Sequence, residues 1–175
     1  MNPFLRAASR PAPLLAAAFV AALAVAPAAS ARSRPPIPAP SRCAVGQPTL
    51  RLEPLDIVTA RGVQHFRVEM ADTDDSRETG LMCRTSVPAN GGMLFDFGTP
   101  QPVSFWMKNT LVPLDMLFIG ADGRIINIAR NTRPLDETPA PSGGPALAVL
   151  ELRGGRAAEL GIAPGDLVRQ RIFRR

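Results

Sequence analysis

Residues 80–115 of this 175-residue chain read GLMCRTSVPANGGMLFDFGTPQPVSFWMKNTLVPLD. Short apolar runs alternate in this stretch with Gly, Pro and Asn, a pattern that predicts short strands joined by turns. The stretch also contains the chain's only Trp and, two positions later, its only Lys: Trp106 and Lys108. Every other cation except His is Arg. We therefore interpret Lys108, beside the indole, as a residue needed for the chemistry of its ammonium group and not only for its positive charge.

Strand patterns continue on both sides of this stretch. Residues 66–70 alternate apolar and polar side chains, as in a half-buried strand. Further strands are expected at residues 55–59, 93–97, 103–108, 114–119, 124–129, 146–152 and 167–173, with short helices within 72–83 and 155–160 and a loop at 134–145. Many short strands and only two small helices predict a mainly β fold, either a compact antiparallel β-barrel or a jelly-roll-like sandwich.

The amino-terminal residues have the pattern of a secretory signal. Arg6 and Arg10 precede an apolar run at 14–25, and residues 29–31 have the small-x-small pattern of a signal-peptidase site. We therefore expect residues 1–31 to be a cleaved signal peptide and the protein to be periplasmic or secreted. An uncleaved anchor is the alternative, but the run is shorter than the ~20 apolar residues of a membrane span. No membrane span is expected after cleavage.

The remaining chain divides into a Pro- and Arg-rich spacer at residues 32–48 and a single globular domain at 49–175. The whole chain carries 20 Lys and Arg against 15 Asp and Glu. All of the excess Arg residues precede residue 49, where no acid occurs, so the expected domain is electrically neutral. A neutral domain has no electrostatic footprint for a polyanion, which argues against nucleic acid as a partner.

The two cysteines, Cys43 and Cys83, suit an exported protein. A disulfide between them would stabilise the fold by roughly 4 kcal/mol through the loop that it closes. The alternative is that Cys83 is a buried apolar filler and Cys43 a free thiol. The sequence leaves both possibilities open.

Seven motifs carry a resemblance to a known family. They are Gly80–Arg84, Gly92–Phe95, Phe105–Thr110, Pro113–Asp115, Asp122–Ile125, Leu150–Leu152 and Leu160–Asp166. Over nearly the whole expected domain, the chain resembles the uncharacterised family called domain of unknown function 192. The resemblance implies a mostly β domain, often exported, with no established activity. Cys83 and Gly120 depart from the family pattern, which usually has an aromatic residue or His at the first position and Asp at the second. Residues 121–123 are expected to link the strands at 114–119 and 124–129 as a hairpin, and no role is assigned to an acid in it.

The Trp and the Lys define a candidate binding site. Alternate side chains of an extended segment share a face, so Trp106 and Lys108 are expected on the same side. An ammonium beside an indole can form a cation–π contact or line a pocket that has an apolar wall and a positive anchor. Such a pocket suits a small anionic molecule or a peptide segment. No cofactor is expected, and the predicted site comprises Arg84, Trp106, Lys108, Asn109 and Asp115.

Two of these residues also have a structural interpretation. Asp115 lies in an apolar run and must be paired if it is buried. Lys108 or Arg84 would then be its partner, forming a structural ion pair in place of a ligand site. Asn109 is equally suited to shaping the turn after the strand.

An enzyme is a second class of function. Lys108 could act as a base or as an imine-forming amine, with Asp115 as the carboxylate. Glu151 and Asp166 are further carboxylates, although Glu151 could instead face solvent or neutralise an Arg, and Asp166 could shape a turn. Neither a nucleophile elbow nor a phosphate-binding loop is recognisable in the sequence.

A methionine-rich copper site is a third possibility. Thioethers and thiolates suit Cu(I), and the candidate ligands are Met82, Met93, Met107, Met116, Cys83 and His65. Methionine also fills irregular gaps in cores, which is the structural alternative. Zinc is disfavoured and no metal ligands are assigned, because one His and two distant Cys do not make a tetrahedral site.

Overall fold

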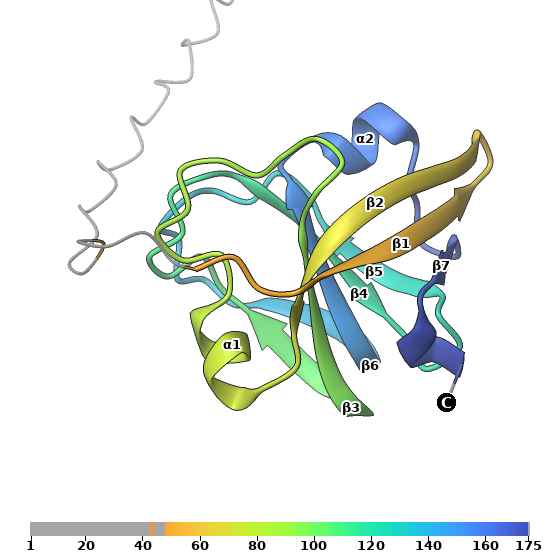
Figure 1. The fold of residues 1–175 in the computed structure, drawn as a ribbon, viewed down its shortest axis with the longest axis horizontal. Helices are drawn as coiled ribbons and strands as arrows, with labels where there is room; N and C mark the ends of the chain where they lie inside the picture. Colours follow the sequence, from red (N-terminus) through yellow and green to blue (C-terminus); the bar gives the residue numbers. More distant parts are fainter. Residues whose placement is uncertain (1–42, 44–47, 175) are drawn as a thin grey trace, which may run out of the picture. The chain divides into compact units, whose positions relative to one another are not determined.

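Seven strands form one sheet that curls into a nearly closed barrel in the computed structural model (Figure 1). The structure describes residues 43 and 48–174. The predicted signal peptide at 1–31 and most of the predicted spacer at 32–48 lie outside the described residues. Within the described part of the chain, no helix is long and apolar enough to cross a membrane.

The strands and helices follow one another with short connections. The strands are β1 Leu52–Thr59, β2 Gly62–Ala71, β3 Met93–Phe105, β4 Leu114–Ile119, β5 Ile125–Ala129, β6 Ala140–Arg153 and β7 Leu167–Arg169. The helices are α1 Asp74–Thr79 and α2 Arg156–Leu160, and a 3-10 turn spans Arg171–Arg174. The predicted mainly β, barrel-like fold with two short helices is therefore confirmed.

The sheet order explains how the barrel closes. The strands lie in the order β5-β4-β6-β3-β2-β1-β7, and all pairs are antiparallel except β2 with β3. A bridge between Arg124 and Leu167 joins the start of β5 to β7 at the other end of this order. Closure leaves few unpaired edges, which protects a β protein from edge-to-edge association.

Three predicted elements were wrong. Residues 93–105 form one strand rather than two, and residues 140–145 belong to β6 rather than to a loop. The prolines that suggested breaks belong to two strands. Those of β3 lie where the β3–β6 register shifts, and those of β6 lie on the part of β6 that β4 does not reach. Residues 170–173 turn away from the barrel because the Gln170 side chain accepts a hydrogen bond from the Ile172 N–H.

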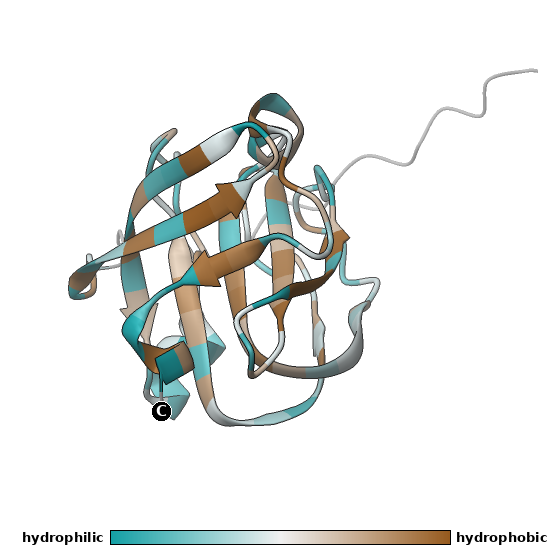
Figure 2. Ribbon diagram, turned by 90° about the vertical axis from the view of Figure 1, so that its right-hand side faces the viewer, coloured by the Kyte–Doolittle hydropathy of each residue, from teal (hydrophilic) through white to brown (hydrophobic). Residues whose placement is uncertain are grey.

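The core has two layers that share the central strands. Strand residues alternate in hydropathy along β1 and β2, as Figure 2 shows for the outer strands, but every residue of β4 is buried. One face of β3, β4 and β6 packs inside the barrel with residues such as Leu94, Leu117 and Leu150. The opposite face packs Phe95 and Phe118 under chain segments outside the sheet. Burial on both faces explains the continuous apolar runs of these strands.

Helix α1 is capped at its start and is held on the sheet by a contact from Arg77. Thr73 is its N-cap and forms a capping box with Ser76, so the start lies close to the predicted one but uses a hydroxyl rather than an aspartate. Arg77 then donates a hydrogen bond of 2.7 Å from Nη1 to the carbonyl oxygen of Asp96 on β3. This contact fixes the helix beside the outer face of β3.

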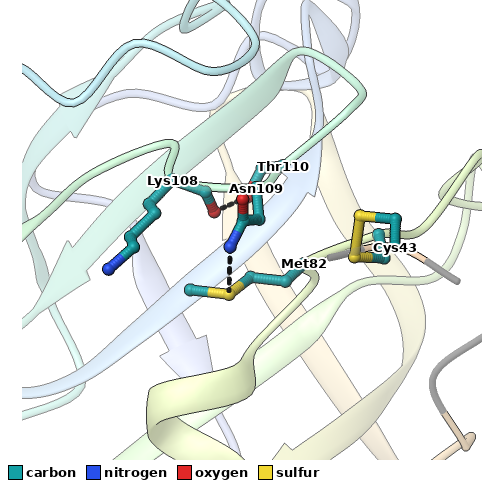
Figure 3. Close-up of a disulfide and its surroundings, with 6 residues drawn as sticks. Cys43, Met82, Lys108, Asn109 and Thr110 are labelled. Carbon is teal, nitrogen blue, oxygen red and sulfur yellow. Dashed lines mark hydrogen bonds between the residues drawn. A yellow bond between two sulfur atoms is a disulfide. The ribbon is translucent and has the colours of Figure 1, made fainter. Parts of the chain in front are cut away.

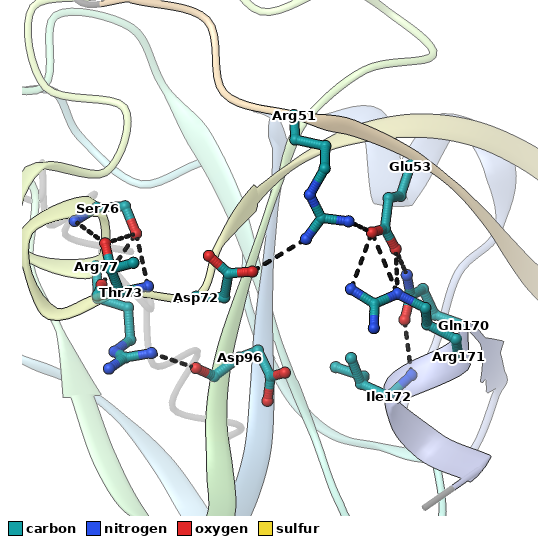
Figure 4. A network of polar contacts seen from close by, with 10 residues as sticks. All are labelled: Arg51, Glu53, Asp72, Thr73, Ser76, Arg77, Asp96, Gln170, Arg171 and Ile172. Atoms are coloured by element: carbon teal, nitrogen blue, oxygen red, sulfur yellow. Dashed lines mark hydrogen bonds and ion pairs between the residues drawn. The ribbon is translucent and has the colours of Figure 1, made fainter.

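A buried carboxylate anchors the carboxyl-terminal turn to β1. Arg51, Gln170 and Arg171 converge on Glu53, which is only 8% exposed (Figure 4). The Arg171 guanidinium is bidentate, with Nε–H and Nη2–H donating to the carboxylate at 2.9 Å. Removing one partner of a desolvated, multiply bonded carboxylate costs far more stability than removing one partner of an exposed ion pair.

We predict that Glu53→Gln lowers the free energy of unfolding by about 2 kcal/mol, because the new amide presents donors to Gln170 and Arg171. Urea unfolding followed by circular dichroism measures this loss. The matched control is Asp72→Asn, which removes the exposed ion pair that Asp72 makes with Arg51 and should cost less than about 1 kcal/mol. Equal losses for the two variants would contradict the anchoring role.

Candidate functional site

A pocket of about 330 Å³ opens beside Trp106 and Lys108. It lies where α1 and the segment after it meet the end of β3, over the outer face of the central strands. Its apolar wall is formed by Leu81, Met82, Phe95, Phe105 and Trp106. Its ionisable groups are Arg77, Glu78, Lys108 and Glu151. An apolar pocket with a few polar groups is the usual form of a small-molecule site.

Trp106 and Lys108 share one side of the loop that follows β3. The Lys108 ammonium lies 5.0 Å from the centroid of the Trp106 ring, and 48% of Trp106 is exposed. Met107, between them, is buried in the outer layer of the core. The predicted alternation is therefore present, although the strand ends at Phe105. Lys108 makes no ion pair with any described residue.

Backbone hydrogen bonds fix the position of this loop. The Met107 N–H donates to the Asp136 carbonyl at 2.9 Å, and the Cys83 N–H donates to the Asn109 carbonyl at 2.8 Å. Cys83 and Asn109 both have positive φ, 61° and 53°, which Asn tolerates better than most residues. Asn109 therefore shapes the loop, and its side-chain N–H also points at the Met82 sulfur, 3.9 Å away.

A disulfide joins the pocket wall to the segment before β1. Cys43 and Cys83 are bonded, with their Cα atoms 5.2 Å apart. Figure 3 shows the disulfide on one side of Met82 and Asn109, while the Lys108 side chain extends on the other side. The bond constrains the Gly80–Arg84 segment, which supplies one side of the pocket.

Asp115 and Arg84 do not belong to this pocket. Asp115 is fully buried and accepts three backbone hydrogen bonds, from Asn131, Gly155 and Ala157, at 2.7–3.1 Å. Arg84 instead pairs with Glu69 at 2.8 Å. The expectation that Lys108 or Arg84 neutralises Asp115 was wrong, because backbone N–H groups satisfy the buried carboxylate.

Glu151 is the residue that the sequence interpretation placed wrongly. It is 4% exposed rather than facing solvent, and it contacts the pocket from β6. Its direct cross-strand neighbours on the same face are Met93 of β3 and Met116 of β4. No described residue donates a hydrogen bond or an ion-pair contact to its carboxyl group. Burial raises the pKa of the Glu151 carboxyl to about 8.

Sequence alone offered one signal for this position. Glu151 interrupts the otherwise apolar run of residues 146–152, a strand that is buried on both faces. In such a strand neither face is open to bulk solvent, so an acid must be paired or must line an internal space. Asp166, the other acid considered, accepts a hydrogen bond from the Ala163 N–H and shapes a turn.

The fold does not bring all of the candidate copper ligands together. Met93, Met107 and Met116 are at most 2% exposed and pack in the outer layer of the core. Cys83 is in the disulfide, and the ring Nδ1 of His65 lies 2.7 Å from the Asp56 carboxylate on the β1–β2 hairpin. Packing therefore accounts for these three thioethers.

Comparison with known proteins now gives the family. The model of domain of unknown function 192 (DUF192), described as "Uncharacterized ACR", matches residues 56–170. The chain belongs to this family. The match confirms the resemblance inferred from the seven motifs, and all residues lining the Trp106 pocket fall within the matched range.

Two solved structures are similar to this DUF192 protein. A protein of unknown function from Novosphingobium aromaticivorans DSM 12444 is 47% identical, with 69% of this chain and 86% of that chain covered and a TM-score of 0.68. A protein from Sinorhizobium meliloti 1021, described as a candidate transcription regulator, is 42% identical, with 73% and 99% covered and a TM-score of 0.69. No functionally curated protein matches the chain.

We predict that Asp115→Asn lowers the free energy of unfolding of this DUF192 domain by about 3 kcal/mol. The amide NH2 would face a backbone N–H of Asn131, Gly155 or Ala157, and one hydrogen bond to a charged acceptor would become a repulsive contact. Chemical denaturation measures the change. Asp122→Asn is the control, because exposed Asp122 accepts only the Arg124 N–H and Asn can accept it too. A loss at Asp115 no larger than at Asp122 would sink the interpretation.

Replacing Glu151 with Gln should change how stability depends on pH. The folded protein holds this proton up to about pH 8, whereas the unfolded chain releases it near 4.5. Within that window the folded state binds more protons, so wild-type stability falls as pH rises, by up to about 1.4 kcal/mol per pH unit from this group. Glu151→Gln removes this contribution to the pH dependence of stability.

Urea unfolding of the two proteins from pH 4 to 9 tests this prediction. The Gln variant should gain stability relative to wild type as pH rises through the window, and the difference should level off above pH 8. Glu78→Gln, which removes an exposed carboxyl at the same pocket, should leave the wild-type profile unchanged. Parallel curves for wild type and Glu151→Gln would show that Glu151 ionises normally.

Proposed function

We propose that this domain binds a small organic anion, or the anionic end of a peptide segment, in the pocket beside Trp106 and Lys108. One observation carries the proposal: the Lys108 ammonium, which pairs with no acid among the described residues, stands beside an exposed indole at an aromatic-walled pocket. The ammonium supplies the charge for a carboxylate, and Phe95, Phe105 and Trp106 supply area for an apolar body. The pocket volume is within the range of small-molecule sites.

The charge balance of the domain supports a small ligand over nucleic acid. Acidic and basic residues are equal in number from residue 49 onward, so there is no excess of cations to neutralise phosphates. The Sinorhizobium meliloti protein is described as a candidate transcription regulator. That description belongs to the Sinorhizobium meliloti protein. In the described part of this chain, Lys108 is the pocket cation that makes no ion pair, and one ammonium suits a single anionic group rather than a polyanion.

We also propose that the protein acts in an exported compartment, the periplasm or the exterior. The signal-like pattern of residues 1–31 supports export. The Cys43–Cys83 disulfide supports it independently, because such bonds persist in oxidising compartments and are rare in the cytosol.

The experiment for ligand binding uses the protein's own fluorescence. The chain has one Trp and no Tyr, so emission excited at 295 nm reports on Trp106 at the pocket. We expect 4-isopropylbenzoate to bind and 4-isopropylbenzyl alcohol, which has the same body without the charge, to bind at least about tenfold more weakly. N-acetylphenylalanine and its amide test the peptide carboxyl terminus in the same way.

Lys108→Met should remove the preference for the anion. This variant keeps an apolar stem and loses the charge, so 4-isopropylbenzoate should bind about tenfold more weakly, with no change for the alcohol. Arg169→Met is the matched control, because Arg169 is an exposed cation on β7 away from the pocket. Benzoate binding that is unaffected by Lys108→Met, or equally reduced by Arg169→Met, would overturn the proposed site.

A further inference from the structure

The floor of the Trp106 pocket contains a carboxyl group that the fold leaves without a partner. Glu151 is 4% exposed, lies on the pocket side of β6, and is flanked on its own face by Met93 and Met116. No hydrogen bond or ion pair joins its side chain to any residue that the structure describes. Buried polar groups normally have partners, so an unpaired carboxyl at a cavity indicates a group that is completed by a ligand or by solvent.

The backbone on either side of Glu151 is closely packed. A Cβ at Gly92 would clash with the Glu151 carbonyl oxygen, so β6 and the segment before β3 approach closely there. A Cβ at Gly80 would lie 3.1 Å from the Phe95 ring, and both of these residues line the pocket together with Glu151.

The groups around Glu151 determine whether its carboxyl is more stable protonated or ionised. The charged groups at the pocket are Arg77 and Glu78 from α1 and Lys108 from the loop, while β3 contributes Ser104 and two phenylalanines, and β4 presents Met116. Arg77 is already bonded to Asp74 and to the Asp96 carbonyl. Glu151 therefore has apolar neighbours and no bound cation, an environment that favours the protonated acid.

We propose that Glu151 is the second recognition group of the pocket and that, as a neutral acid, it donates a hydrogen bond to an oxygen acceptor of the ligand. This inference rests on the proposed function and extends it. The ligand class becomes an organic anion with an apolar body that carries, apart from its anionic group, a carbonyl or similar oxygen. A protonated acid in an apolar site is an effective donor to such an oxygen.

The same geometry makes binding depend on pH. Ionised Glu151 is an acceptor only, so it repels a carbonyl oxygen. Affinity for an acceptor-bearing anion should therefore decline as Glu151 loses its proton. Binding of an anion without the acceptor should change little over the same range.

The test compares two probes of similar shape by Trp106 fluorescence at pH 6 and pH 9.5. These are 4-acetylbenzoate, which has a ketone oxygen, and 4-isopropylbenzoate, which has none; both carboxylates are ionised throughout. The ratio of their dissociation constants should shift in favour of the isopropyl compound by about tenfold between pH 6 and pH 9.5. A third probe, 4-(aminomethyl)benzoate, reports whether Glu151 prefers a cation instead.

Two variants complete the test. Glu151→Gln keeps an N–H donor at every pH, so it should bind 4-acetylbenzoate with no pH dependence. Glu151→Met matches the neighbouring methionines and should bind both benzoates equally at either pH. Thermal unfolding confirms that both variants are folded before they are titrated.

The possible failures are distinguishable. If both benzoates bind through Lys108 but their ratio is unaffected by pH and by Glu151→Met, the role of Glu151 is refuted and the proposed function stands. If 4-(aminomethyl)benzoate binds most tightly and strengthens with rising pH, Glu151 acts as an anion and the proposal is wrong. If neither benzoate changes Trp106 emission at millimolar concentration, both the proposed function and this inference fail.

Discussion

The structure depends on the burial of β3, β4 and β6 on both faces. One face fills the barrel, and the barrel closes around it through the contact between the start of β5 and β7. The other face is also apolar and must be kept from water, but the described residues form no second sheet that could cover it. The chain covers it with irregular segments, which contribute Leu81, Val87 and Met107. A cover made of loops packs less completely than a sheet, and the Trp106 pocket lies in it.

A cover of this kind must be tied down, because loops lose more conformational entropy per buried contact than strands do. The Cys43–Cys83 disulfide constrains one side of the pocket, and the Cys83 N–H then holds the Asn109 carbonyl of the facing loop. A hydrogen bond from the Met107 N–H to the Asp136 carbonyl fixes the same loop at a second point. The positive φ values of Cys83 and Asn109 show that the backbone accepts unfavourable conformations to make these contacts. Trp106 and Lys108 thus stand on a loop with little freedom, as a preorganised site requires.

The fold could be predicted from sequence wherever a local pattern, such as alternation of apolar residues or a turn motif, was enough to define the element. Alternation in residues 66–70 and the turn at Ala121–Gly123 gave correct strands, because their neighbours impose the same pattern. The error at residues 140–145 arose because prolines exclude a central strand only where both edges are paired, and pairing is not visible in one sequence. The site was predictable in part: Trp106 and Lys108 meet as expected, but the partners of Asp115 are backbone N–H groups, which leave no trace in residue identities.

The two buried acids of the central strands, Asp115 and Glu151, differ in whether the fold supplies their hydrogen-bond partners. Asp115 and Glu151 occupy adjacent positions of the β4–β6 ladder, since Asp115 pairs with Leu152 and Met116 pairs with Glu151. Their side chains therefore point to opposite faces of the same sheet. Asp115 accepts hydrogen bonds from three N–H groups, that of Asn131 after β5 and those of Gly155 and Ala157 where α2 begins, and so holds these two segments together. Glu151 meets two methionines and a pocket, so its presence lowers the stability of the fold as pH rises from about 4.5 to about 8, without any structural return. A residue that costs stability at a cavity, one ladder position from a residue that provides it, fits the ligand-binding role that we propose for this pocket.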